Sequence, residues 1–175
     1  GIIQKQGIQN TIISYLGIII GFVNLIIIQP FFLTKEEVGL VRVLFSFSTL
    51  VAIIVPLGIT NITIKYFPVF RNKEKGHYGF LGFILLFPLA GSIIIFCLIS
   101  IFKDAIIGQY VVNSKLFTDY FDYVLPLSII LGFISVLNIY CFSLFKTTVP
   151  SLLNDIANKI LTIVVISLYF LKWID

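Results

Sequence analysis

The sequence predicts an all-α membrane protein with about five transmembrane helices. Composition is the first reason: 59% of the 175 residues are hydrophobic, 11% are charged, and the mean hydropathy is +1.10. Such a chain has too little polar surface to cover a soluble globule of this size. The second reason is that residues 18–28 are continuously apolar except for Gly21 and Asn24. A transmembrane β-strand would instead alternate apolar and polar residues over about ten positions, so helices are predicted.

Five segments approach the roughly 20 apolar residues that a helix needs to cross about 30 Å of hydrocarbon. They are residues 11–31, 38–59, 80–102, 124–145 and 150–171. The first segment is not a cleavable signal peptide, because its apolar part is too long and is followed by Gln29, Pro30 and Phe31 instead of small residues. We expect it to remain in the mature protein.

The distribution of lysine and arginine predicts a cytoplasmic N-terminus. With that orientation the inside segments hold Lys5, Lys65, Arg71, Lys73, Lys75, Lys146 and Lys159, and the outside segments hold Lys35, Lys103, Lys115 and Lys172. The loop over residues 61–79 is then the main cytoplasmic anchor, and the chain ends outside. Because it stops directly after the fifth span, we expect a piece of a longer protein.

No constellation of residues points to catalysis, a metal or another cofactor. Cys97 and Cys141 lie within spans and lack metal-ligand spacing, so they are read as small core residues. His77 stands in the basic loop and is read as a solvated loop residue. The first four spans hold no carboxylate, so we do not expect an enzyme. The net charge of +4 indicates attraction to the lipid bilayer, with no aromatic and basic interleaving to suggest nucleic acid.

The first predicted helix has one polar or small face. Thr11, Ser14, Gly17, Gly21, Asn24 and Gln29 fall within about 140° around its axis. Gly17 and Gly21 form a small-xxx-small pair that allows close helix packing. Asn24 and Gln29 need hydrogen-bond partners away from lipid, either in a cavity or on another helix.

The second predicted helix has a narrower polar stripe. Ser46, Thr49, Pro56 and Thr60 lie within roughly 40° of Arg42 around the axis. An arginine inside a span costs about 2.5 to 3.5 kcal/mol and usually faces a bundle interior or a watery cavity. The alternative is that Arg42, four residues after Val38, extends to the outer headgroups.

The later helices also carry polar groups. The fourth has Ser128, Gly132, Ser135 and Asn138 on one side, and the third has Gly82, Gly91 and Pro88, which should bend it. The fifth carries Asn154 and Asn158 beside the i,i+4 pair of Asp155 and Lys159. Its purely apolar part, residues 160–171, is too short to span alone, so its first turns either stand in the cytoplasm or border a cavity.

Thr34 and Glu37 match the capping-box pattern directly before the second helix. The capping box is one of several local motifs that occur in a characteristic order along the first 75 residues. These are Lys5, Gln6 and Asn10 at the start, Gln29-Pro30-Phe31-Phe32-Leu33, Leu33-Thr34-Lys35-Glu36-Glu37-Val38-Gly39, Pro56-Leu57-Gly58 and Lys65-Tyr66-Phe67-Pro68. In this order the chain resembles the N-terminal part of O-antigen type polysaccharide flippases, in the multidrug/oligosaccharidyl-lipid/polysaccharide exporter superfamily. The likeness covers most of residues 1–75 and continues beyond them as hydropathy and spacing.

The resemblance implies a two-lobed transporter of about 12 to 14 helices around a central cavity that opens alternately to each side of the membrane. This chain would form most of the N-terminal lobe, with the remaining C-terminal helices as its partner. The substrate implied is an undecaprenyl-diphosphate-linked oligosaccharide in the bacterial inner membrane, for polysaccharide biosynthesis. Arg42 is then the first candidate for the diphosphate. Lys65 stands where such proteins often carry arginine, so a planar clamp becomes a point charge. The other cavity candidates are Asn24, Gln29, Ser46, Thr49 and Asn138.

Two other functions remain open. One is a multidrug or small-solute antiporter of the same superfamily, which would favour an acidic or aromatic cavity. The other is a small helical scaffold subunit that assembles through the face of Gly17 and Gly21. The cations and the lack of a carboxylate within the first four spans favour the flippase.

Overall fold

The computed structural model describes residues 1–110 and 115–171, and over these ranges the chain is helical without β-strands. It divides into two compact units, one formed by Gly1–Gly39 with Phe145–Asp175 and the other by Leu40–Leu144. Lys172, counted above among the outside cations, lies outside the described residues.

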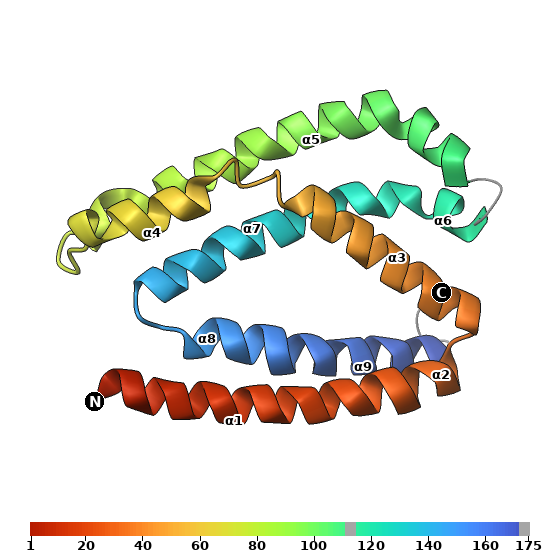
Figure 1. The fold of residues 1–175 in the computed structure, drawn as a ribbon, viewed down its shortest axis with the longest axis horizontal. Helices are drawn as coiled ribbons and strands as arrows, with labels where there is room; N and C mark the ends of the chain where they lie inside the picture. The colour runs from red at the N-terminus through yellow and green to blue at the C-terminus, as the bar shows by residue number, and fades with distance from the viewer. Residues whose placement is uncertain (111–114, 172–175) are drawn as a thin grey trace. The chain divides into compact units, whose positions relative to one another are not determined.

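The first unit consists of two helical rods. One contains α1 (Ile2–Phe22), the π-helical turns of Val23–Ile28 and α2 (Gln29–Phe32), and the other contains α8 (Thr148–Ser151), the π-helical turns of Leu152–Ala157 and α9 (Asn158–Phe170). The rods lie side by side and run in the same direction, as the red and blue helices of Figure 1 show. Asn10 bonds to Thr147 near their starts, and the rings of Phe32 and Phe170 meet 4.8 Å apart at their ends.

The second unit contains α3 from Leu40 onward and all of α4 to α7. These are α3 (Lys35–Ala52), α4 (Ile59–Phe70), α5 (Phe80–Tyr110), α6 (Lys115–Asp119) and α7 (Val124–Ser143), with short 3-10 turns at Gly76–Gly79 and Phe121–Tyr123. Helix α7 packs against both α4 and α5. One cluster of buried residues joins Phe67 of α4, Phe80 of α5 and Val136 of α7. The three helices are therefore held by shared apolar contacts.

The predicted capping box is confirmed at the start of α3. The N–H and hydroxyl of Thr34 donate to Oε2 of Glu37 at 2.7 and 2.9 Å, and the N–H of Glu37 donates back to the Thr34 hydroxyl at 3.3 Å. Because the backbone bond from Thr34 stabilises the carboxylate, the pKa of Glu37 is lowered from its ordinary value of 4.5. This turn precedes the second predicted span.

The second predicted helix, residues 38–59, is not continuous. Helix α3 ends at Ala52, a turn follows, and α4 begins at Ile59. Pro56 has no N–H for the helical ladder, and Leu57 and Gly58 have φ of 49° and 77°, which a right-handed helix does not allow. The prediction of one helix here is wrong because it counted the proline and glycine as part of the span.

In the part of the chain that the structure describes, four helices are long and apolar enough to cross a membrane. They are Gln4–Phe32, Gly76–Gln109, Phe121–Ser143 and Thr148–Phe170. They correspond to four of the five predicted spans. Helix α3 is not among them, because its 18 residues include Lys35, Glu36, Glu37 and Arg42.

Candidate functional site

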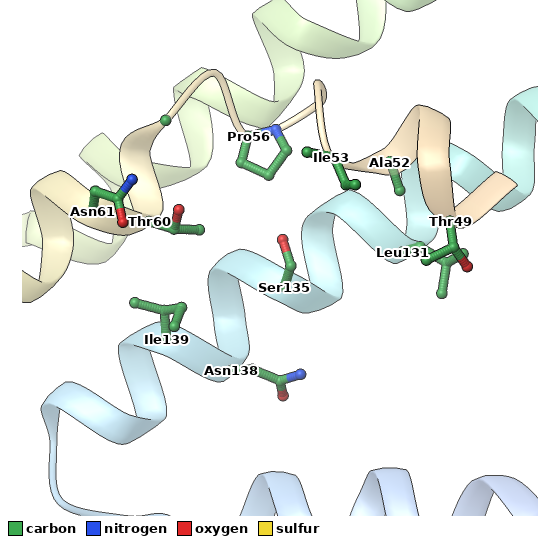
Figure 2. A pocket seen from close by; sticks show the side chains of 11 residues that line it. Thr49, Ala52, Ile53, Pro56, Thr60, Asn61, Leu131, Ser135, Asn138 and Ile139 are labelled. Atoms are coloured by element: carbon green, nitrogen blue, oxygen red, sulfur yellow. The ribbon is translucent and has the colours of Figure 1, made fainter. Parts of the chain in front are cut away.

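A groove of about 700 Å³ lies in the second unit, beside the turn that separates α3 from α4. Figure 2 shows its lining, which comes from α3, the turn, α4 and α7. The lining residues are Thr49, Ala52, Ile53, Pro56, Gly58, Thr60, Asn61, Leu131, Ser135, Asn138 and Ile139. Five of these side chains are hydroxyls or amides, and none of the described residues that line the groove is ionisable. The groove therefore offers hydrogen bonds without charge.

Val55, in the turn beside the groove, packs closely against two glycines. Val55 is fully buried, and a Cβ at Gly91 of α5 would lie only 1.9 Å from its carbonyl oxygen. A Cβ at Gly132 of α7 would lie 2.4 Å from its Cγ1. No larger residue fits at either glycine without movement of the turn. The glycines thus let α5, the turn and α7 meet at one point.

Two hydroxyl groups of the groove are held by hydrogen bonds to main-chain carbonyl oxygens of their own helices. The hydroxyl of Ser135 donates to the carbonyl oxygen of Gly132 at 2.7 Å, and that of Thr49 donates to Phe45 at the same distance. Both oxygens keep lone pairs that can accept from a ligand. The amides of Asn61 and Asn138 have no hydrogen-bond partner among the described residues, so each can donate and accept.

The structure separates the predicted site residues into several places. Thr49 and Asn138 line the groove. Arg42 and Ser46 do not: both are exposed and border a shallow hollow of about 280 Å³ with Val43, Phe47 and Leu50. Lys65 is exposed on α4, and its Nζ lies 5.4 Å from the ring centre of Tyr66. The predicted cations therefore do not line the groove.

Asn24 and Gln29 belong to the first unit. Asn24 is only 6% exposed, and its Oδ1 has no hydrogen-bond partner among the described residues. It stands in the π-helical turns that precede Pro30, whose ring would clash with the carbonyl group four residues earlier in a regular α-helix. The wider turns accommodate that proline and turn Asn24 inward.

The small face of the first rod packs against the second rod. A Cβ at Gly17 would lie 2.7 Å from the carbonyl oxygen of Asp155, and one at Gly21 would lie 3.3 Å from Nζ of Lys159. Nζ of Lys159 donates to the carbonyl oxygen of Gly17 at 2.9 Å, and Ser14 Oγ lies 3.3 Å from Oδ2 of Asp155. The polar first turns of the fifth predicted span thus bond to α1.

Asn61 lines the groove, although the sequence predicts it as the first residue of a loop and not as a site residue. The sequence feature that could have placed Asn61 in the site is Pro56-Leu57-Gly58. A break there starts a new helix, α4, which packs against α7. Thr60 and Ser135 were recognised as polar but were not joined. His77 is part of a local loop structure, because its Nδ1 accepts from the N–H of Asn72 at 3.1 Å.

Among residues 1–110 and 115–171 no three His, Cys, Asp or Glu side chains gather as a metal site would require. Four long apolar helices are compatible with a multi-pass membrane protein. No protein-family model, curated protein or solved structure matches the chain.

Proposed function

We propose that the chain is part of a transporter that moves lipid-linked oligosaccharides across the bacterial inner membrane by alternating access. The observation that supports this most is the uncharged, hydrogen-bonding groove beside the α3–α4 turn. A sugar presents many hydroxyl groups, each a donor and an acceptor. The amides of Asn61 and Asn138 and the hydroxyls of Thr49, Thr60 and Ser135 are complementary to such a ligand.

Arg42 fits the charged part of the same substrate. It stands seven residues before Thr49 on the continuous helix α3. Seven residues are nearly two turns, so both side chains leave the same face, about 10 Å apart along the axis. A diphosphate bound at Arg42 and a sugar bound at Thr49 would then lie about 10 Å apart along one face of α3. We therefore assign the diphosphate to the hollow at Arg42 and the saccharide to the groove.

One observation favours the antiporter as a second candidate. A hollow of about 410 Å³ is lined almost entirely by aromatic and apolar side chains: Ile62, Tyr66, Phe70, Tyr78, Phe80 and Phe83. Aromatic faces bind organic cations. The scaffold function has less support, because the face of Gly17 and Gly21 that it would use is already covered by the second rod of the same unit.

The test uses the intact protein in cells that depend on it for surface polysaccharide. Asn138→Leu combined with Ser135→Ala should lower polysaccharide output by about tenfold or more, because each lost hydrogen bond contributes about 0.5 to 1.5 kcal/mol. The control is Ser143→Ala on the same helix, because Ser143 does not line the groove and its hydroxyl donates to the main-chain carbonyl oxygen of Ile139. Protein abundance is measured in parallel.

Dye efflux is the reciprocal measurement. If the antiporter function holds, Tyr66→Ala should reduce dye efflux, and the groove variants should leave polysaccharide output unchanged. That pair of results would contradict the proposed flippase.

A further inference from the structure

We propose that α3, the turn at residues 53–58 and α4 form one membrane crossing that is interrupted at mid-membrane depth. Neither helix is a complete span. Helix α4 has 12 residues and rises about 18 Å, and the part of α3 after Arg42 has ten residues and rises about 15 Å. Together with the turn, they cover the thickness of the hydrocarbon. Such a crossing does not depend on what the protein transports.

The segment from α3 to α4 runs in register with α7. The hydroxyl of Ser48 in α3 donates to the carbonyl oxygen of Val124, at the start of α7. Val55 in the turn lies against Gly132, and the ring of Phe67 in α4 meets that of Tyr140 at 5.3 Å. The chain therefore advances alongside α7 from one end of that helix to the other and in the same direction. Because α7 lies in one of the four helices long enough to span, its neighbour covers the same depth.

The direction of the two rods in the first unit also requires a further crossing. Its two rods are parallel, with Asn10 beside Thr147 at one end and Phe32 beside Phe170 at the other. When both rods cross the membrane, the end of the first and the start of the second lie on opposite faces. The chain between them must then cross an odd number of times. Helices α5 and α7 supply two crossings, so one more is required, and α3 with α4 supplies it.

The interruption falls near the middle of the bilayer. Val55 lies against Gly132, close to the midpoint of α7, and against Gly91, close to the midpoint of the predicted span 80–102. Helices α5 and α7 are antiparallel neighbours, since Phe80 joins the same cluster as Phe67 and Tyr140. The turn therefore lies level with the midpoints of two adjacent spans.

A broken backbone at that depth is tolerated only where it is buried in protein or faces a watery cavity. Both conditions are present here. The carbonyl oxygen of Val55 is packed against Gly91, and on the other side Pro56 and Gly58 line the groove. The groove is consequently a polar site at mid-membrane depth, and its side chains should be reached by water.

The crossing is tested with single cysteines in the intact protein, after Cys97 and Cys141 are replaced by alanine. Lys35→Cys and Lys73→Cys replace exposed lysines that flank the segment on either end. An impermeant thiol reagent should label Lys35→Cys in intact cells and Lys73→Cys only in inverted membrane vesicles. Labelling of both positions from the same face would show that α3 and α4 turn back without crossing, and would overturn the proposal.

The depth of the groove is tested by a second pair on α7. Ser135→Cys faces the groove, and Ile134→Cys lies at the same depth on an exposed face. A charged thiosulfonate reagent should modify Ser135→Cys at least about tenfold faster than Ile134→Cys, because hydrocarbon excludes charge. Equal rates at the two positions would contradict a mid-membrane polar site. Neither measurement uses transport, so failure of the flippase assignment would leave both results interpretable.

Discussion

Lys159 donates a hydrogen bond from Nζ to the carbonyl oxygen of Gly17 at 2.9 Å. The lysine stands near the middle of the apolar rod Thr148–Phe170, where a charged side chain is costly unless it is held by a polar partner. A main-chain carbonyl on the neighbouring rod supplies that partner. The approach is possible because neither Gly17 nor Gly21 has a Cβ in the way. The pair therefore fixes the register of the two rods.

The first prediction concerns this close approach. Gly17→Ala places a Cβ about 2.7 Å from the carbonyl oxygen of Asp155, so the rods must separate. We expect a loss of about 1 to 3 kcal/mol in the free energy of unfolding, as for other overpacked sites. The measurement is the thermal unfolding midpoint of the purified protein in detergent.

Gly7→Ala is the matched control for that substitution. Gly7 lies in the same helix and has no atom within 4 Å of its added Cβ. Alanine is favoured over glycine in a helix by about 0.8 to 1.0 kcal/mol, so this variant should be as stable as the parent or more stable. Equal effects of the two substitutions would show that Gly17 has no packing role.

The second prediction separates the two glycines around Val55. At Gly132 an added Cβ meets the side chain of Val55, whereas at Gly91 it meets the carbonyl oxygen. Val55→Gly removes the first obstacle and leaves the second. A double-mutant cycle should therefore show a coupling energy of about 0.5 to 3 kcal/mol between Gly132→Ala and Val55→Gly. The cycle of Gly91→Ala with Val55→Gly should show a smaller coupling energy. A larger coupling energy for Gly91→Ala than for Gly132→Ala would contradict this geometry.

The four long apolar helices could be predicted from the sequence, because hydropathy and length are sufficient for that inference. The interruption could be predicted only in part. Pro56 and Gly58 indicate where the second helix ends, but the restart at Ile59 depends on distant contacts. Phe67 is fully buried against Phe80 and Tyr140, and no local pattern contains that information.

The candidate site, too, could be predicted from the sequence only in part. The stripe of Thr49 and Thr60 and the polar side of α7 were visible as separate helical faces. Their meeting in one groove depends on the turn at Pro56, which changes the direction of the chain. Arg42 was placed in the same stripe, but α3 ends at Ala52, so the stripe does not continue as one face into α4. Helical periodicity assigns a face only as far as the helix extends.

The third prediction is a pH dependence at the start of α3. The pKa of Glu37 is lowered in the fold, chiefly by the backbone hydrogen bond from Thr34. A lowered pKa gives stability that is present above the unfolded value near 4.5 and is lost as the pH falls through the folded value. Thermal stability should therefore decrease below about pH 4.5, and Glu37→Gln should remove part of that decrease while still accepting the capping bond. An identical pH profile in Glu37→Gln would show that other groups cause it.

The last prediction concerns Arg42, which the structure places outside the groove but on the face of α3 that leads to Thr49. If its guanidinium binds a diphosphate, Arg42→Ala should reduce polysaccharide output by about tenfold to a hundredfold, since a charged hydrogen bond contributes about 1.5 to 3 kcal/mol. Membrane insertion should be unchanged or improved, because a charge is removed from the span. Arg42→Lys should recover only part of the activity, as it keeps the charge and loses the planar fork.

An arginine that merely extends to the headgroups gives another pattern: lysine replaces it fully, and alanine lowers abundance more than output per molecule. Output and abundance are therefore measured together, and full output of Arg42→Ala at normal abundance would remove this residue from the site.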